Sequence, residues 1–339
     1  MGKRIVNDIF AAAGILLLIL DSRTALLGAQ SAVELCISSV IPSLFPFLVL
    51  SGMLTAAINR ANLRILRPLG HLLGIPAGTE GIFITGILGG YPTGAQAVHQ
   101  AWSKGQLSSE EATRMLAFCS NAGPAFLFGI LGTKFTYGWI PWLLWGIHIL
   151  SAIAVAVILP AKRNGVRKLS TASPVTVTQA LKTAVVTMGY ICGWIILMRV
   201  ILGFLDRWVL WLFPTEVRIC FYGFIELTNG CCDADAVSTQ GLRFILCSAM
   251  LAFGGICVAM QTASVTGKLG IKHYLRGKIM QTIISLFLSA TIQLFVFSSS
   301  ERAQISPILI LSLLLLILLY CAILRKNEKK SSIPAFIGV

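Results

Sequence analysis

The sequence predicts an all-α fold: a polytopic helical membrane protein with two inverted repeats, each containing a re-entrant helical hairpin and a broken transmembrane helix. Composition is the first observation, because 56% of the 339 residues are hydrophobic and only 12% are charged, against about 25% charged in soluble domains. Uncharged runs are the second, since each approaches or exceeds the roughly 20 residues that cross the hydrocarbon core. They span 35–59, 81–103, 135–161, 244–267, 279–300 and 303–324.

The third observation is a break inside the apolar run 81–103, where Gly89, Gly90 and Gly94 surround Tyr91-Pro92-Thr93. Pro92 removes a backbone donor and the glycines lower helix propensity. At membrane depth, broken backbone is tolerated only where it is buried in protein or lines a water-filled cavity. Discontinuous helices of this kind build substrate and ion sites in secondary transporters.

Basic residues give the chain a net charge of +14 and cluster between the predicted spans. This is the positive-inside pattern, and it predicts a multi-pass protein of the cell membrane with both termini and the linker 161–178 in the cytoplasm. The predicted partner is the lipid bilayer and not nucleic acid, and homo-oligomerisation is left open. The clusters are Lys3/Arg4, Arg60/Arg64/Arg67, Lys162/Arg163/Arg167/Lys168, Lys268/Lys272/Arg276/Lys278 and Arg325/Lys326/Lys329/Lys330.

The first repeat is expected over 1–160. Residues 9–20 are predicted to form a retained first helix, because no small-residue cleavage site follows the run cleanly. The next span, 33–57, carries Pro42 and Pro46 and is therefore expected to kink.

A hairpin over 80–103 is then expected to enter and leave the membrane on one side. Ser108 and the acidic residues after it predict a helix N-terminus. That helix meets a second break at 121–124, which contains Gly123 and Pro124.

The second repeat, 179–297, is expected to follow the linker in the same order. Its hairpin is placed at 214–252 with a tip at 226–230 that ends on Gly230, and its broken helix is interrupted at Gly254 and Gly255. Matching interrupted segments in two halves indicate an inverted-repeat transporter core. The run 303–324 is predicted to be an anchor helix and 325–339 a basic tail.

Glu226 is the foremost candidate for ligand binding, because it follows an apolar segment. A carboxylate in hydrocarbon costs roughly 2.5–3.5 kcal/mol on insertion scales, so such residues mark ion or substrate paths. The alternative is that Glu226 lies at a re-entrant tip in bulk water.

Neutral polar residues at the breaks are the other candidates. The amides of Asn121 and Gln261 could bind a cation or a polar ligand, or instead bond between helices. Thr93, Thr228 and Asn229 lie at the predicted tips, where free N–H groups could meet a ligand. Tyr91 is also a candidate, although it and Pro92 could simply shape the turn.

The remaining polar residues suggest structural roles. Arg199 is expected to snorkel to the interface, or to pair with Glu226 or Asp206. The four histidines, His71, His99, His148 and His273, show no ligand spacing and are assigned to the interface. Adjacent Cys231 and Cys232 could bind a metal, pair, or pack as small residues. Enzyme motifs are missing from the sequence, so we expect a non-enzyme with no cofactor and no metal site.

A series of motifs in fixed order resembles the YlbJ-type sporulation integral membrane proteins, within the nucleoside-recognition or Gate-domain family. The motifs are IPSLFPF (41–47), GYPTGA (90–95), SSEEATRMLAFCSNAGPAF (108–126), ELTNG (226–230) and FGGICVAMQ (253–261). The resemblance implies a distant likeness to concentrative nucleoside transporters, in which Glu226 would match the carboxylate that holds the ribose. It also implies a role in endospore formation, in the mother-cell or forespore membrane.

The functional hypothesis is a transporter-like protein that moves or senses a small polar solute through paired re-entrant hairpins. An ion gradient rather than ATP would drive it, because the chain carries no nucleotide-binding motif; a coupling cation is left open. The alternative is a non-transporting membrane scaffold for spore envelope or coat assembly, which would use the linker and the basic tail to dock partners.

Overall fold

The computed structural model describes residues 2–61, 64–161 and 175–302, and every regular element within them is a helix. The all-α prediction is therefore confirmed for this part of the chain. Five of its helices are long and apolar enough to cross a membrane: Ser22–Ile58, Ile140–Ile158, Val177–Trp208, Gln240–Leu269 and Lys272–Val296. The predicted anchor 303–324, the tail 325–339 and most of the linker lie outside the described residues.

The first span begins earlier than predicted. Helix α1 (Gly2–Leu20) is followed by α2 (Ser22–Leu35), a π-helical turn (Cys36–Val40) and α3 (Ile41–Ala61). The expected start at 33 is wrong because α2 begins at a cap, where the Asp21 side chain accepts a hydrogen bond from the Thr24 backbone N–H at 3.3 Å. Pro46 lies inside α3, and the π-helical turn directly precedes the first turn of α3.

The first break folds the chain back on itself. After α4 (Arg67–Leu73), helices α5 (Gly81–Gly89) and α6 (Thr93–Ser103) form a hairpin around Gly90, whose φ is +74°. The two helices approach so closely that a Cβ on Gly94 would lie 2.8 Å from the Gly86 Cα, and a Cβ on either glycine would collide with the Cys119 carbonyl. Glycine is required there because any side chain would meet backbone.

The predicted second break is also present. Helix α7 (Ser109–Leu116) starts at a capping box between Ser108 and Glu111, as the acidic first turn predicts. Residues 118–123 are not helical, and α8 (Pro124–Gly129) follows. Helix α9 (Ile140–Ile158) completes this half.

The second half repeats this order. The long span α10 (Val177–Trp208) precedes a hairpin of α11 (Thr215–Ile225) and α12 (Leu227–Cys232), which turns at Glu226. The fold-back is thus shorter than the predicted 214–252, because α13 (Gln240–Phe253) is the first half of a broken helix. Gly254, with φ +81°, separates α13 from α14 (Gly255–Thr266), and α15 (Lys272–Val296) follows.

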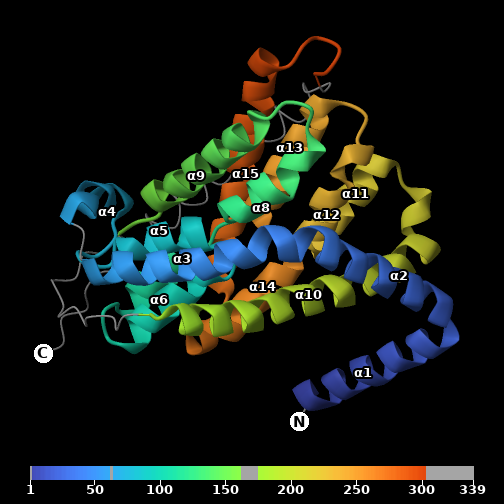
Figure 1. The fold of residues 1–339 in the computed structure, drawn as a ribbon, viewed down its shortest axis with the longest axis horizontal. Coiled ribbons are helices and arrows are strands. Elements are labelled where there is room, and N and C mark those ends of the chain that lie inside the picture. Colours follow the sequence, from blue (N-terminus) through green and yellow to red (C-terminus); the bar gives the residue numbers. More distant parts are fainter. Residues whose placement is uncertain (1, 62–63, 162–174, 303–339) are drawn as a thin grey trace, which may run out of the picture.

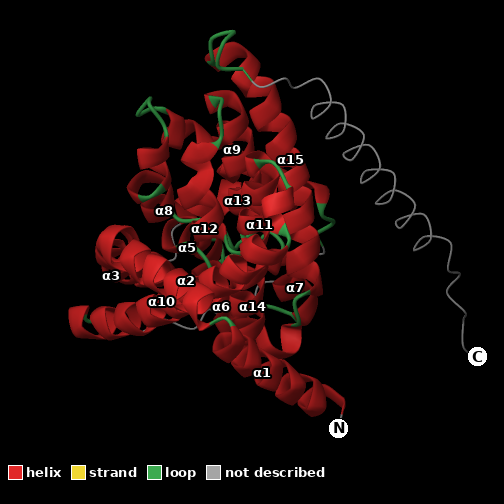
Figure 2. Ribbon diagram, turned by 90° about the vertical axis from the view of Figure 1, so that its right-hand side faces the viewer, coloured by secondary structure: helices red, strands yellow, loops and turns green. Residues whose placement is uncertain are grey.

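The helices form two groups that cross. In Figure 1, α3 and α10 lie side by side along one flank, while α9, α13 and α15 run across them. Helix α1 projects away from the rest (Figure 2). One buried apolar cluster gathers around α8, α9, α12 and α13, and another around α5, α6, α7 and α15. The hairpin tips and the breaks lie where these helices meet.

Candidate functional site

Each hairpin tip packs on the break of its own half. A Cβ built on Gly90 would lie 3.2 Å from the Gly123 amide nitrogen, so the first tip touches the first break through backbone alone. A Cβ on Gly255 would lie 3.0 Å from the Gly223 carbonyl oxygen and 3.2 Å from the Leu227 nitrogen, so the second tip touches the second break in the same way. The two halves therefore use the same kind of contact.

Tyr91 connects the two halves. Its hydroxyl donates a hydrogen bond to the Leu251 carbonyl at 3.0 Å, near the end of α13. A Cβ on Gly254 would lie 3.3 Å from the Tyr91 ring, so the second break also packs on the first tip. From its sequence context, Tyr91 could contact a ligand or shape the turn; in the structure it also bonds across to the other half.

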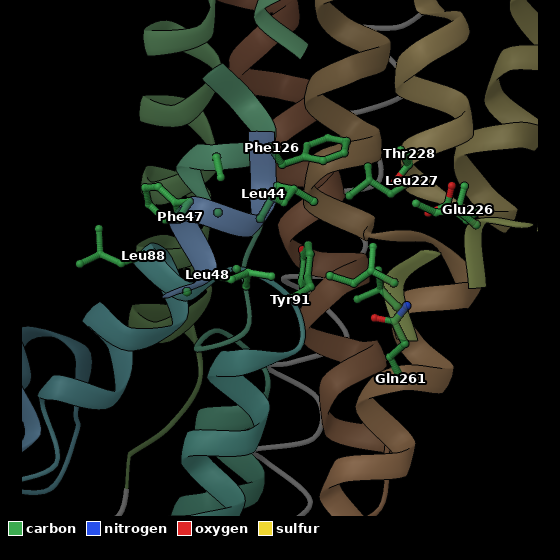
Figure 3. A pocket seen from close by; sticks show the side chains of 18 residues that line it. Leu44, Phe47, Leu48, Leu88, Tyr91, Phe126, Glu226, Leu227, Thr228 and Gln261 are labelled. Carbon is green, nitrogen blue, oxygen red and sulfur yellow. The ribbon is translucent and has the colours of Figure 1, made fainter. Parts of the chain in front are cut away.

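A cavity of about 80 Å³ lies between the tips and the breaks. Figure 3 shows mostly leucine and phenylalanine side chains on one side, and Glu226, Leu227, Thr228 and Gln261 on the other, with Tyr91 between them. A water molecule needs about 10–15 Å³ on this measure, so the space holds several waters or a small solute. Its lining residues are Leu44, Phe47, Leu48, Leu88, Gly89, Gly90, Tyr91, Ala122, Gly123, Ala125, Phe126, Ile191, Ile195, Glu226, Leu227, Thr228, Val258 and Gln261.

The Glu226 side chain is buried by protein, being only 3% exposed. Its carboxylate caps α12 and accepts a hydrogen bond from the Asn229 backbone N–H at 2.7 Å. A carboxylate at a helix N-terminus is favoured by the helix dipole and by the free N–H groups there. The alternative that placed Glu226 in bulk water does not fit this burial.

Lys278 on α15 is the centre of a buried polar network beside this cavity. Its amine donates to the Tyr91 hydroxyl at 3.1 Å, to the Ser120 carbonyl at 2.5 Å and to the Gln281 side-chain oxygen at 2.7 Å. The side chain is fully buried. The assignment of Lys278 to a cytoplasmic basic cluster is therefore wrong, because the residue points into the protein at the first break.

The network continues from Lys278 to the first break and to α9. The Gln281 amide donates to the Asn121 side-chain oxygen at 3.1 Å and to the His148 carbonyl at 3.2 Å. The His148 ring accepts a hydrogen bond from the Ala122 backbone N–H at 3.0 Å and is 1% exposed. The interfacial assignment of His148 is thus wrong: its ring caps a backbone donor that the break leaves unpaired.

The predicted site residues divide into two groups. Gly89, Gly90, Tyr91, Gly123, Glu226, Thr228 and Gln261 line the cavity. Asn121 instead donates to the Phe118 carbonyl and accepts from Gln281, and Thr93 donates to the Gly89 carbonyl. Asn229 is fully buried beside the second tip, and neither of its side-chain amide atoms has a hydrogen-bond partner among the described residues.

Arg199 and the adjacent cysteines are not brought into the cavity lining. The Arg199 guanidinium pairs with Asp233 at 2.7 Å, whereas Asp206 pairs with Arg218. From sequence, Arg199 was expected to snorkel or to pair with Glu226 or Asp206, and Asp233 was not considered as its partner. Cys231 and Cys232 are free and buried. Within the described residues no group of three metal-ligating side chains comes together.

Sequence reasoning missed Lys278 and Gln281, although a signal was present. Along α15, buried polar residues recur at intervals of three and four within an otherwise apolar helix: Tyr274, Lys278, Gln281, Ser285, Ser289 and Gln293. This spacing places them on one helix face. A polar face on an apolar span indicates protein contact rather than lipid contact, and it would have identified Lys278.

Comparison of the chain with protein-family models, curated proteins and solved structures finds no match. The site must therefore be interpreted from its own geometry.

Proposed function

We propose that this chain is a membrane protein that binds a small polar solute in the cavity between its two hairpin tips, and that it moves or senses that solute. One observation supports the proposal above the others. A single cavity is lined by both tips and both broken segments, from Gly90 and Gly123 to Glu226 and Val258. Binding at such a junction can change how the halves pack, which is what translocation requires.

The lining indicates the chemistry of the solute. The Glu226 carboxylate and the Gln261 side-chain oxygen accept hydrogen bonds, whereas leucine, isoleucine and phenylalanine side chains supply the remaining walls. A small solute with O–H or N–H donors on one edge and an apolar face on the other fits this arrangement. A role in endospore formation rests on the sequence resemblance alone.

Thiol accessibility tests the proposal without knowledge of the solute. In a chain whose native cysteines have been replaced, Thr228→Cys places a thiol at the cavity, and Ser285→Cys places one in the packed α13–α15 contact. A charged, membrane-impermeant methanethiosulfonate reagent is applied to sealed vesicles. We expect Thr228→Cys to react and Ser285→Cys to stay unmodified, because only the cavity is reached through water. An unreactive Thr228→Cys would contradict a solute pathway and favour a scaffold.

A ligand screen tests the same cavity directly. The full-length protein is heated with nucleosides, amino acids or sugars, since a compound that binds only the folded state raises the unfolding midpoint. We expect at least one compound to raise the unfolding midpoint of the wild type and of the control Glu216→Gln, which lies on α11. The same compound should not raise the midpoint of Glu226→Gln. A response that survives Glu226→Gln, or no response to any compound, would remove the proposed site.

A further inference from the structure

The Lys278 amine has the coordination of a bound cation. Its three N–H donors meet three oxygen atoms from three parts of the fold: the Tyr91 hydroxyl at the first tip, the Ser120 carbonyl in the first break, and the Gln281 side chain on α15. All three acceptors are uncharged. The ammonium is thus fully satisfied without any anion.

Two aromatic rings also face the Lys278 amine. The amine lies 5.0 Å from the centre of the Tyr91 ring and 5.8 Å from that of Tyr274, within cation–π range. No aspartate or glutamate of the described residues forms an ion pair with it. A fully buried ammonium is costly, and no carboxylate offsets that cost here.

The acceptors belong to the class that holds free cations in discontinuous helices. Where a helix unwinds, its carbonyl oxygens lose their helical partners and coordinate sodium ions or protons in transporters. Ser120 lies in such an unwound segment, between α7 and α8. A hard monovalent cation at the Lys278 Nζ position would meet the same carbonyl, hydroxyl and amide oxygens.

We propose that Lys278 is a tethered cation: its ammonium fills a monovalent-cation site between the first tip and the first break, so that this junction needs no free sodium ion. The inference deepens the proposed function and rests on it only for the role of the site in a transport cycle. It explains why a lysine is buried there. The positive charge draws Tyr91 and Ser120 together. Because Tyr91 also lines the cavity and bonds to Leu251 on α13, fixing Tyr91 fixes this wall of the cavity relative to α13.

Chemical rescue tests this assignment. Lys278→Ala removes Cγ, Cδ, Cε and Nζ, and propylammonium supplies the same heavy atoms as a free cation. The unfolding midpoint of the full-length protein is measured in propylammonium chloride against choline chloride at equal ionic strength. We expect a rise of at least about 3 °C for Lys278→Ala, as occupancy of a native-state site predicts.

Three controls must not respond: the wild type, whose site is filled; Lys278→Met, whose side chain fills the space without charge; and Lys272→Ala, which removes an exposed lysine of the same helix. If Lys278→Ala folds but ignores propylammonium, the tethered-cation assignment fails. If Lys278→Ala does not fold, propylammonium is added during purification. Failure to recover folded protein under that condition also overturns the assignment.

The wild type supplies an independent measurement. Exchanging choline for sodium should leave its midpoint unchanged, and a saturable rise in sodium would show that the junction still needs a free cation. Neither result depends on thiol access to the cavity. If propylammonium rescues Lys278→Ala but Thr228→Cys is unreactive, solute transport is contradicted and the cation site is supported. If Thr228→Cys reacts but propylammonium does not rescue Lys278→Ala, the solute pathway is supported and the cation site is contradicted.

Discussion

The two junctions of tip and break share a shape but are stabilised differently. The first, at Gly90 and Gly123, is held by side chains from other helices: Lys278 and Gln281 reach it from α15, and His148 from α9. The second, at Glu226 and Gly255, is held mainly by itself, since the Glu226 carboxylate caps the helix that follows it. The first junction is therefore fixed by the surrounding bundle. The second junction has fewer hydrogen bonds to the rest of the bundle, so fewer would break if it moved.

This difference assigns different roles to the two junctions. The network at the first junction links the first tip, the first break, α9 and α15 through several buried hydrogen bonds. Such a network resists displacement, because moving one group leaves several others unsatisfied. A tip capped by its own carboxylate can move as a unit without losing that bond. We infer that the first junction is the fixed side of the cavity and that the second is the side that rearranges.

The largest expected effect comes from adding a methyl group to a closely packed glycine in the first helix of each hairpin. A Cβ on Gly86 would collide with the backbone carbonyl of Cys119, whereas one on Gly223 would collide with the flexible side chain of Met250. We expect Gly86→Ala to cost about 3 kcal/mol or more and Gly223→Ala about 1 kcal/mol, because a side chain can rotate away and a carbonyl cannot.

Thermal unfolding of the two purified glycine variants, followed by tryptophan fluorescence, measures this order. Gly146→Ala is a neutral control, since nothing lies within 4 Å of the added atom. Equal losses for Gly86→Ala and Gly223→Ala would show that these two positions are equally constrained and would remove this part of the comparison.

The next effect compares two glutamines. Gln281 is fully buried and makes three hydrogen bonds in the Lys278 network, whereas Gln261 lines the cavity and donates to the Cys257 sulfur at 3.3 Å. We expect Gln281→Leu to cost about 2–3 kcal/mol, since it orphans a buried ammonium donor, and Gln261→Leu less than about 1 kcal/mol. The unfolding midpoints should separate accordingly. A larger loss from Gln261→Leu would reverse the assignment of fixed and movable sides.

The residues of the two junctions also show how far the site could be predicted from sequence. The breaks at Gly90, Gly123 and Gly254 follow from local chemistry, because glycine and proline interrupt a helix whatever surrounds them. Glu226 stands out for the same reason, as a charge beside an apolar run. The helical fold and the tips were therefore open to sequence reasoning.

The partners of Lys278 were not, because they come from distant parts of the chain, although the polar face of α15 marks Lys278 itself. Lys278 lies beside basic residues in sequence, and only folding brings it to Ser120 and Tyr91. Asn121 was singled out as a ligand group, but its partner Gln281 is 160 positions away. Local composition identifies where a helix breaks, whereas the groups that satisfy the break come from packing.

A smaller effect is expected at the second tip. Glu226→Ala removes the acceptor for the Asn229 N–H and should cost about 1 kcal/mol, the usual loss for a helix cap. Glu226→Gln keeps an oxygen in place and should cost less. The midpoints of these two variants, compared with wild type, check the order. A loss from Glu226→Ala as large as that from Gln281→Leu would mean that the second tip is also held by the bundle.

The smallest effect is expected at the corresponding position of the first tip. Thr93 donates its hydroxyl to the Gly89 carbonyl at 3.1 Å, while its backbone N–H already bonds to the Gly90 carbonyl at 2.8 Å. Thr93→Val keeps the shape of the side chain and removes only the hydroxyl bond, so we expect about 0.5 kcal/mol. Thr93→Ser, which retains the hydroxyl, is the matched control, and both unfolding midpoints are measured against wild type. The loss is small because Lys278, Gln281 and His148 hold the first tip and break from outside, so a local bond adds little there. A loss above that of Glu226→Ala would mean that the first tip depends on its own bonds, and the contrast between the two junctions would then disappear.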